Sequence, residues 1–196
     1  MYQIGIDEVG RGPLAGPVVV CAVALKKGSN LLHIFPKGVL RDSKKLSSLQ
    51  RKKIINEIKQ YEIAEEIVVG IGESSASYVD EFGIVPAITK AMNEAFQKIL
   101  EQGATEIAKV YLDGGLRLPY DCPQETVIRG DEKIIEISLA SIIAKEYRDE
   151  LMKLYDVTCN GYGFINNSGY GTKAHIEAIK SKGVSMFHRR SFLKKY

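Results

Sequence analysis

The stretch that decides the fold is Tyr2-Gln3-Ile4-Gly5-Ile6-Asp7, together with the apolar run Pro17-Val18-Val19-Val20-Cys21-Ala22-Val23-Ala24-Leu25 that follows it. We expect the first segment to be a strand that ends at the turn Gly10-Arg11-Gly12-Pro13. The second segment is rich in β-branched residues and lacks polar alternation, which is typical of a strand buried on both faces. A sheet built around such a strand needs helices on both sides.

Strand and helix patterns alternate along the rest of the chain. Further strands are expected at 62–71, 107–112 and 125–128. Helices are expected from Ser47 to about residue 61, and at 84–101, 138–155 and 173–181. Short early connections followed by strand–helix alternation predict the α/β class, with a mixed sheet flanked by helices on both faces.

Length and composition are those of an ordinary globular protein. The 196 residues, 45% hydrophobic and 26% charged, fit one compact domain. The longest apolar run, Val18 to Leu25, is too short to span a membrane, and Met1-Tyr2-Gln3-Ile4 does not resemble a secretory signal. Cys21, Cys122 and Cys159 lack metal-ligand spacing, which excludes a zinc ribbon and fits a reducing compartment. We therefore expect a soluble, cytoplasmic protein.

Charge is distributed unevenly along the chain. The net charge is +3, but residues 172–196 carry seven Lys and Arg and a single acid, Glu177, so this end is +6 and the preceding part is −3. A basic end favours an anionic partner, and nucleic acid is the obvious candidate. On charge alone, a solvated tail that only aids solubility is the alternative.

Two adjacent carboxylates, Asp7 and Glu8, end the first expected strand. Neighbouring side chains of a regular strand point to opposite faces, so Asp7 alone would face a site. Glu8 can join it only where the chain bends or bulges, which Gly10 and Gly12 permit. A solvated acidic strand end is the alternative interpretation.

Two further acids stand beside glycines. Asp113 ends an apolar strand, where open α/β sheets place their ligands, and Asp131 lies in a loop before a helix. Each could be an ordinary Asp-Gly turn. Together with Asp7 and Glu8 they predict a carboxylate cluster, which needs cations because neighbouring carboxylates raise each other's pKa. Two Mg²⁺ ions on such hard oxygen ligands could clamp the attacking and leaving oxygens of a phosphodiester.

Other residues offer contacts to a phosphate backbone and its sugars. Ser43 and Lys44 present a hydroxyl and an ammonium group before a helix. Tyr162 and Tyr170 stand among glycines, so their rings can stack on sugars or bases; ordinary loop packing is the alternative. We expect a cationic rim formed by His175, His188, Arg189 and Arg190. Surface solvation is the alternative for the histidines.

Seven motifs, in order, resemble those of ribonuclease HII, and they cover the chain from Ile4 to Phe192. They are Asp-Glu-x-Gly-Arg-Gly-Pro-Leu-Ala-Gly-Pro-Val-Val (7–19), Asp-Ser-Lys-Lys-Leu (42–46), Leu-Asp-Gly (112–114), Gly-Asp (130–131), Ala-Ser-Ile-Ile-Ala-Lys-x-x-Arg-Asp (140–149), Gly-Tyr-Gly-Thr-Lys-x-His (169–175) and His-Arg-Arg-Ser-Phe (188–192). The first motif is specific by itself, although Val9 stands where alanine is common in the family.

The resemblance implies a ribonuclease H-like fold, with a five-stranded mixed sheet flanked by helices and a small helical C-terminal part. It implies a single catalytic domain over residues 1–196, with a core of about 1–155 and a basic, substrate-binding part of about 156–196. The implied activity is endonucleolytic hydrolysis of RNA in RNA–DNA hybrids, including cleavage 5′ of one ribonucleotide in duplex DNA to leave 3′-hydroxyl and 5′-phosphate ends. Two Mg²⁺ or Mn²⁺ ions would be the cofactors.

The resemblance also assigns site residues. Asp7, Glu8, Asp113 and Asp131 match the family's catalytic, metal-binding carboxylates. The loop Gly10-Arg11-Gly12 matches the segment whose backbone meets the 2′-hydroxyl, the group that separates RNA from DNA. Tyr170 matches the tyrosine that packs on the sugar following the ribonucleotide. The remaining candidate substrate contacts are Ser43, Lys44, Lys173, His188 and Arg189.

The expected partner is an RNA–DNA hybrid or ribonucleotide-containing duplex DNA, bound by a monomer without a membrane contact. Because the chain ends at Tyr196, we expect no tail-borne contact with a sliding clamp, and the N-terminal substrate-binding domain of ribonuclease HIII is missing. Two other functions explain less of the sequence. A sugar-kinase-like phosphotransferase shares Gly5-Ile6-Asp7 but needs two lobes, and a non-catalytic nucleic-acid-binding module leaves four carboxylates unexplained.

Overall fold

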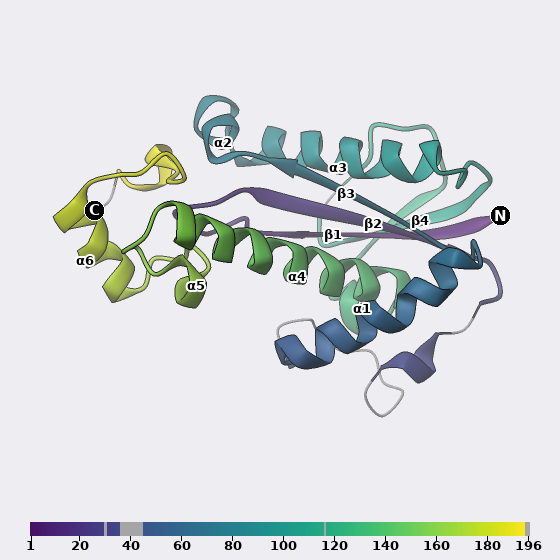
Figure 1. Cartoon of the computed structure of the whole chain (residues 1–196). Helices are drawn as coiled ribbons and strands as arrows, with labels where there is room; N and C mark the ends of the chain where they lie inside the picture. Colours follow the sequence, from purple (N-terminus) through teal and green to yellow (C-terminus); the bar gives the residue numbers. More distant parts are fainter. Residues whose placement is uncertain (30, 36–44, 116, 195–196) are drawn as a thin grey trace.

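The computed structural model describes residues 1–29, 31–35, 45–115 and 117–194 (Figure 1). Its centre is a five-stranded sheet of β1 (Tyr2–Val9), β2 (Val18–Lys26), β3 (Ile67–Ser74), β4 (Ile107–Asp113) and β5 (Gln124–Val127), in the spatial order β3-β2-β1-β4-β5. Strands β1 and β3 pair antiparallel with β2, whereas β4 pairs parallel with β1 and with β5. The expected mixed sheet is therefore confirmed.

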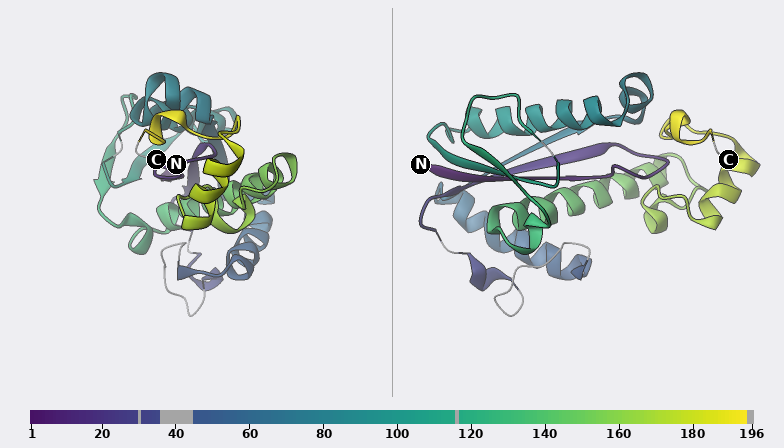
Figure 2. Two further views of the ribbon diagram at one scale, coloured as in Figure 1. Left: turned by 90° about the vertical axis from the view of Figure 1, so that its left-hand side faces the viewer. Right: turned by 180° about the vertical axis from the view of Figure 1, so that it is seen from behind.

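Helices cover both faces of the sheet. Helix α3 (Ile84–Glu101) packs on β2 and β3 from one side, and α4 (Ile135–Thr158) packs on β1 and β2 from the other, with α1 (Ser48–Ile63) beside it (Figures 1 and 2). Shorter elements are α2 (Ala76–Phe82), α5 (Phe164–Asn167), α6 (Lys173–Lys182) and 3-10 turns at Leu32–Ile34, Gly130–Glu132 and Arg190–Phe192. The three layers confirm the α/β class.

Strand β2 explains why two cores form. One set of alternating side chains faces α3 and joins its apolar stripe: Val18, Val20, Ala22 and Ala24. The other set faces α4 and α1: Val19, Cys21, Val23 and Leu25. All eight are buried, so the unbroken apolar run reflects a strand that is covered on both sides.

Local signals place two helices where the sequence predicts them. Ser47 Oγ accepts from Gln50 N at 3.3 Å while Gln50 Oε1 accepts from Ser47 N at 2.9 Å, a capping box that starts α1. Helix α3 has the expected bounds, Ile84–Glu101, with one buried face against the sheet. Neither α2 nor α5 is expected from periodicity, because helices of 7 and 4 residues are too short to show one.

One expected strand is shifted along the chain. The pattern predicts a strand at 62–71, whereas α1 continues to Ile63 and β3 runs from Ile67 to Ser74. The chain turns at Glu65, whose φ of 56° is left-handed, so the strand begins only after that residue. At its other end β3 pairs with β2 as far as Ser74, although its last three residues, Gly72, Glu73 and Ser74, lack an apolar pattern.

The chain after α4 forms a small helical part at the end of the sheet where β1 ends (Figure 1). It packs around Tyr162 and Phe164, and Ala15 of the β1–β2 loop joins this core. The amides of Leu14 and Ala15 donate to Gly169 O at 2.8 and 3.2 Å, which ties the β1–β2 loop to the C-terminal part.

No helix in the described part of the chain is both long and apolar enough to cross a membrane.

Candidate active site

Asp7 and Asp113 lie side by side at the carboxyl ends of two adjacent parallel strands. The register of β1 and β4 sets Ile6 beside Leu112, and both of these side chains are buried in the core beneath α3. Because side chains alternate along a strand, the next residue on each strand points to the opposite face, toward α4. The strand pairing thus explains why these two carboxylates are neighbours.

Glu8 lines the same cavity as Asp7 without a break in the strand. From the sequence this would need a bend or bulge; β1 and β2 stay in register through Glu8–Val20 and Val9–Val19, so their pairing contains no bulge at Glu8. The pairing of β1 with β4 ends at Ile6, so in the described structure this edge of β1 is open at Glu8. The Glu8 side chain can therefore reach the cavity around the end of the sheet.

Asp131 lies in the 3-10 turn Gly130–Glu132, which follows β5. Arg129 takes a left-handed conformation with φ of 57°, and this reverses the chain into the turn. The Gly130 amide then donates to Asp113 Oδ1 at 2.7 Å, which fastens the turn to the end of β4. This hydrogen bond holds Asp131 close to the strand-end carboxylates.

These carboxylates line one cavity of about 210 Å³. Its wall consists of Asp7, Glu8, Val9, Gly10, Arg11, Gly12, Asp113, Asp131, Ser141, Lys145 and Tyr170. The four predicted carboxylates, the predicted glycine loop and one predicted aromatic residue are thus brought together from four separate stretches of the chain.

The electrostatics of the cavity are dominated by Asp7, which is only 8% exposed. Burial raises the pKa of Asp7 from 3.8 to about 7, the hydrogen bond from Ser141 opposes this, and the charges of Glu8 and Asp113 raise it further. An ionised carboxylate at this position is therefore costly unless a positive charge lies close to it.

The donor set fits a hard divalent cation such as Mg²⁺ or Mn²⁺, because the cavity offers four carboxylates and neither histidine nor cysteine. Among the described residues, however, no three His, Cys, Asp or Glu side chains converge as a ready-made metal-binding group. The carboxylates already have protein partners: Asp7 accepts from the Glu8 amide at 2.8 Å, Asp113 accepts from Gly130, and Glu8 pairs with Arg11 at 3.6 Å.

Predicted substrate contacts fall into three groups. Ser43 and Lys44 lie outside the described residues. Tyr170 lines the cavity and is 45% exposed, so its ring is accessible. Lys173 begins α6 with a side chain that is 92% exposed, paired at 4.0 Å with Glu177, and it does not line the cavity.

The expected cationic rim is wrong for His175, His188 and Arg189, whose side chains are buried. Ser185 N donates to His188 Nδ1 at 3.0 Å, so the proton of this imidazole is on Nε2, which lies 3.0 Å from His175 Nε2. His175 must then carry its proton on Nδ1, which donates to Tyr170 O at 2.8 Å. Both imidazoles are neutral, and burial lowers the pKa of each.

Ser141 and Lys145 also line the cavity, although neither is predicted as a site residue from the sequence. They are four residues apart on α4 and therefore share one face of that helix. Lys145 also pairs with Asp149 one turn later. Their signal is a polar pair at helical spacing, with Ser141 inside and Lys145 directly after the otherwise apolar stretch Ala140 to Ala144, which is unusual in a helix packed on a sheet.

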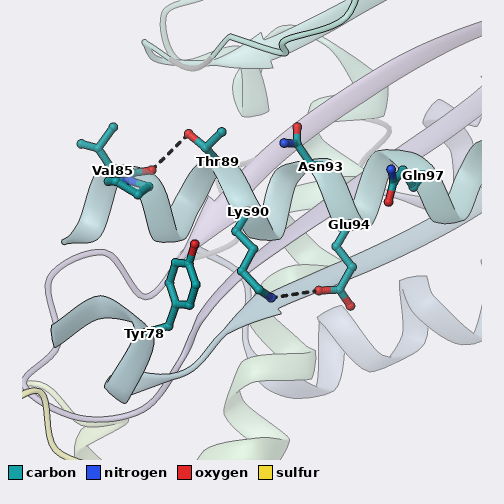
Figure 3. Close-up of a pocket in the computed structure, with 8 residues that line it drawn as sticks. Tyr78, Val85, Thr89, Lys90, Asn93, Glu94 and Gln97 are labelled. Atoms are coloured by element: carbon teal, nitrogen blue, oxygen red, sulfur yellow. Dashed lines mark hydrogen bonds and ion pairs between the residues drawn. The ribbon is translucent and has the colours of Figure 1, made fainter. Parts of the chain in front are cut away.

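A larger hollow of about 740 Å³ lies on the outer side of α3, close to Tyr78 of α2 (Figure 3). Its single carboxylate, Glu94, already pairs with Lys90 at 3.7 Å and with Lys98 at 2.8 Å. This surface lacks the convergent acidic groups of the strand-end cavity, so size alone does not identify the site.

A carboxylate-lined cavity at the strand ends of a β3-β2-β1-β4-β5 mixed sheet defines a metal-dependent nuclease of the ribonuclease H fold. The model of the family described as ribonuclease HII matches residues 4–195. The chain belongs to the ribonuclease HII family. It is therefore a metal-dependent hydrolase of phosphodiester bonds that acts on RNA–DNA substrates.

Individual relatives agree with this assignment. The chain is 43% identical over 194 residues to a ribonuclease HII of Lachnoclostridium phytofermentans, covering 98% of this chain and 70% of the relative. It is 43% identical over 188 residues to that of Enterococcus faecalis, covering 96% and 68%.

Solved structures show the same fold. The ribonuclease HII in a PCNA complex from Archaeoglobus fulgidus matches with a TM-score of 0.73 at 25% identity, covering 97% of this chain and 94% of that one. A Bst ribonuclease HIII in complex with Mn²⁺ matches with a TM-score of 0.74 at 19% identity, covering 98% and 67%.

Proposed function

We propose that the chain is an endonuclease that hydrolyses the RNA strand of RNA–DNA hybrids and cuts 5′ of single ribonucleotides in duplex DNA, leaving 3′-hydroxyl and 5′-phosphate ends. The observation that carries this proposal is the single cavity that contains four carboxylates, the loop Gly10–Gly12 and the exposed ring of Tyr170. A nuclease that selects ribonucleotides needs groups for both the phosphate and the sugar, and this cavity offers both.

Asp7, Glu8, Asp113 and Asp131 are the proposed catalytic residues, and they would hold two Mg²⁺ or Mn²⁺ ions. The Mn²⁺ bound to the Bst ribonuclease HIII supports this choice of metal. Such ions supply an activated water and stabilise the departing 3′-oxygen. The carboxylates would position that chemistry at the scissile phosphate, and no side chain of the protein acts as the nucleophile.

Substrate recognition would come from the residues that line the cavity beside the carboxylates. The backbone of Gly10, Arg11 and Gly12 would meet the 2′-hydroxyl, while Tyr170 would pack on the next sugar. Ser43, Lys44 and the exposed Lys173 would contact backbone phosphates. His188 and Arg189 are buried, so their contribution to substrate binding would pass through the residues that they hold.

We also infer the organisation of the chain in this reaction. Residues 1–196 would act as one catalytic unit, in which about 1–155 carry the carboxylates and about 156–196 form the basic part beside the cavity. The unit would work as a monomer in the cytoplasm.

Asp113→Asn tests the assignment. The variant should lose Mg²⁺-dependent cleavage of a duplex with one ribonucleotide by about 100-fold or more, because it removes a proposed metal ligand while keeping the acceptor for Gly130. The cut is mapped on a sequencing gel with and without Mg²⁺.

Asp121→Asn is the matched control, since Asp121 is exposed and outside the cavity. It should cleave as the unchanged chain does, and circular dichroism should show that both variants are folded. Cleavage by a folded Asp113→Asn at the rate of the control would contradict the proposed metal site.

A further inference from the structure

Two arginines that line no part of the cavity wall are buried beneath its glycine loop. Arg148 of α4 and Arg189, just before the last 3-10 turn, are both 0% exposed. Every hydrogen bond that the structure gives their guanidinium groups goes to a backbone carbonyl. Two buried like charges are costly, and burial followed by the charge of Arg148 lowers the pKa of Arg189 to about 10.

Arg189 holds the carbonyls at both ends of the β1–β2 loop. Its Nη2 donates to Gly10 O at 2.7 Å and to Gly16 O at 2.8 Å, and its Nη1 donates to Arg11 O at 3.1 Å. Its Nε also donates to Gly16 O at 3.0 Å. A planar guanidinium fixes the direction of each of these carbonyls, whereas the three donors of an ammonium group rotate about a single nitrogen and impose no such plane.

Arg148 holds the neighbouring carbonyls and reaches the segment that carries Tyr170. Its Nε donates to Pro17 O at 3.0 Å, its Nη2 to Ala15 O at 3.1 Å and its Nη1 to Ser168 O at 2.9 Å. The side chain therefore links both substrate-facing segments, the loop after β1 and the turn before Tyr170, to the rigid helix α4.

Fixing these carbonyls also fixes the amides on the other side of each peptide. The described residues contain no cis peptide bond, and in a trans peptide the N–H points opposite to the C=O. Because the carbonyls of Gly10 and Arg11 point inward to Arg189, the amides of Arg11 and Gly12 point away from it, toward the cavity that these residues line.

Gly10 completes this arrangement. It has φ of 88°, a left-handed conformation that favours glycine, and a side chain there would collide with Arg148 and with Pro17 O. The loop conformation and the positions of the two guanidinium groups therefore depend on each other. Another loop conformation would leave the buried charges of Arg148 and Arg189 without their hydrogen-bond acceptors.

We infer that Arg148 and Arg189 are positioning residues that set the sugar specificity of the site, by aiming the Arg11 and Gly12 amides at the 2′-hydroxyl. This inference rests on the proposed function. Replacement of Arg148 or Arg189 should reduce the preference for a duplex that contains a ribonucleotide. If these arginines had a purely structural role, their replacement would weaken the binding of every duplex equally.

The test measures the ratio of two dissociation constants in Ca²⁺, for an all-DNA duplex and for the same duplex with one ribonucleotide. Arg189→Lys keeps the charge but loses the planar fork, so the ratio should fall by about 3–10-fold, the value of one lost hydrogen bond. Arg148→Lys should lower the ratio in the same direction. Arg117→Lys, an exposed arginine outside the cavity, is the matched control and should leave the ratio unchanged.

Chemical rescue separates positioning from folding. Guanidinium chloride at low millimolar concentration should restore the ratio in Arg189→Ala, while urea, which is planar but uncharged, should not. Melting curves of each variant show whether it is folded.

The outcomes distinguish the inference from the proposed function. A normal ratio in folded Arg189→Lys and Arg148→Lys, or no rescue by guanidinium, would overturn the inference alone. A wild-type chain that neither prefers nor cleaves the ribonucleotide duplex would overturn the proposed function and this inference with it.

Discussion

Asp7 illustrates at the scale of one residue how the site conflicts with stability. Its carboxylate is buried beside Glu8 and Asp113, and it accepts hydrogen bonds from the Glu8 amide at 2.8 Å and from Ser141. Such a group lowers the free energy of unfolding in the absence of a cation. The same destabilisation favours cation binding, because an ion that neutralises the carboxylates removes this destabilisation.

Asp7→Asn should therefore stabilise the metal-free protein. We expect the free energy of unfolding in urea with EDTA to rise by about 1–3 kcal/mol, because the amide keeps the shape and loses the buried charge. Addition of Mg²⁺ should stabilise the unchanged chain more than the variant. Asp121→Asn, which is exposed, should change the free energy by less than about 0.5 kcal/mol. A less stable Asp7→Asn in EDTA would refute this.

At the scale of elements, glycines set how closely helices approach the sheet. A side chain at Gly5 of β1 would collide with the backbone of Glu136 and Ile137, so α4 lies directly on the strand at this point. Gly70 and Gly72 of β3 allow the same close contact with α3. Since α4 carries Ser141 and Lys145 of the cavity, the Gly5 contact also fixes one wall of the site.

Gly5→Ala should lower the free energy of unfolding by about 3 kcal/mol, because the added methyl group meets backbone atoms that cannot rotate away. Cleavage should fall as well, since α4 must shift. Chemical denaturation together with the cleavage assay checks both effects. Gly115→Ala is the matched control: a methyl group there enters open space, and its φ is not in the left-handed region. Equal stability of the two variants would show that α4 does not depend on this contact.

Across the whole molecule, buried polar groups join the C-terminal part to the rest. The His188–His175–Tyr170 chain of hydrogen bonds and the Arg189 contacts to the β1–β2 loop both start from the last 20 or so residues described. The basic residues expected from the charge distribution thus fall into two groups. Lys173 is exposed to solvent, whereas Arg189 lies inside the protein.

The paired imidazoles predict how stability depends on pH. Burial, and then the neighbouring His175, lower the pKa of His188 from 6.5 to about 4, so the folded state keeps it neutral while the unfolded state takes up a proton below pH 6.5. This stabilisation is present above pH 6.5 and is lost as the pH falls toward 4, by about 2–3 kcal/mol.

Urea denaturation between pH 7.5 and 4.5 measures this loss. His188→Gln should be less stable at pH 7.5 but should show a shallower decline toward low pH. His33→Gln is the matched control, because His33 is exposed and its Nε2 lies 2.9 Å from the Tyr61 hydroxyl, away from the buried pair. A decline in His188→Gln as steep as in the control would contradict the role of the pair.

Much of the fold could be predicted because its signals are local. Ser47 and Gln50 mark a helix start within four residues, and the apolar run of β2 by itself requires two covered faces. The strand expected at 62–71 was placed with the wrong bounds, because the turn at Glu65 and the pairing of Ser74 with Val18, which set its limits at 67 and 74, depend on contacts between distant segments.

The sequence by itself determined the type and order of the central elements, the four carboxylates at chain positions where strands or turns end, and the family. Only the tertiary structure decided that Glu8 lines the cavity although β1 and β2 stay in register there, and that His175, His188 and Arg189 are buried. The physical reason is that a charged or polar side chain is buried only where hydrogen-bond partners surround it. For Arg189 those acceptors are carbonyls more than 170 residues earlier in the chain, which no local pattern can reveal.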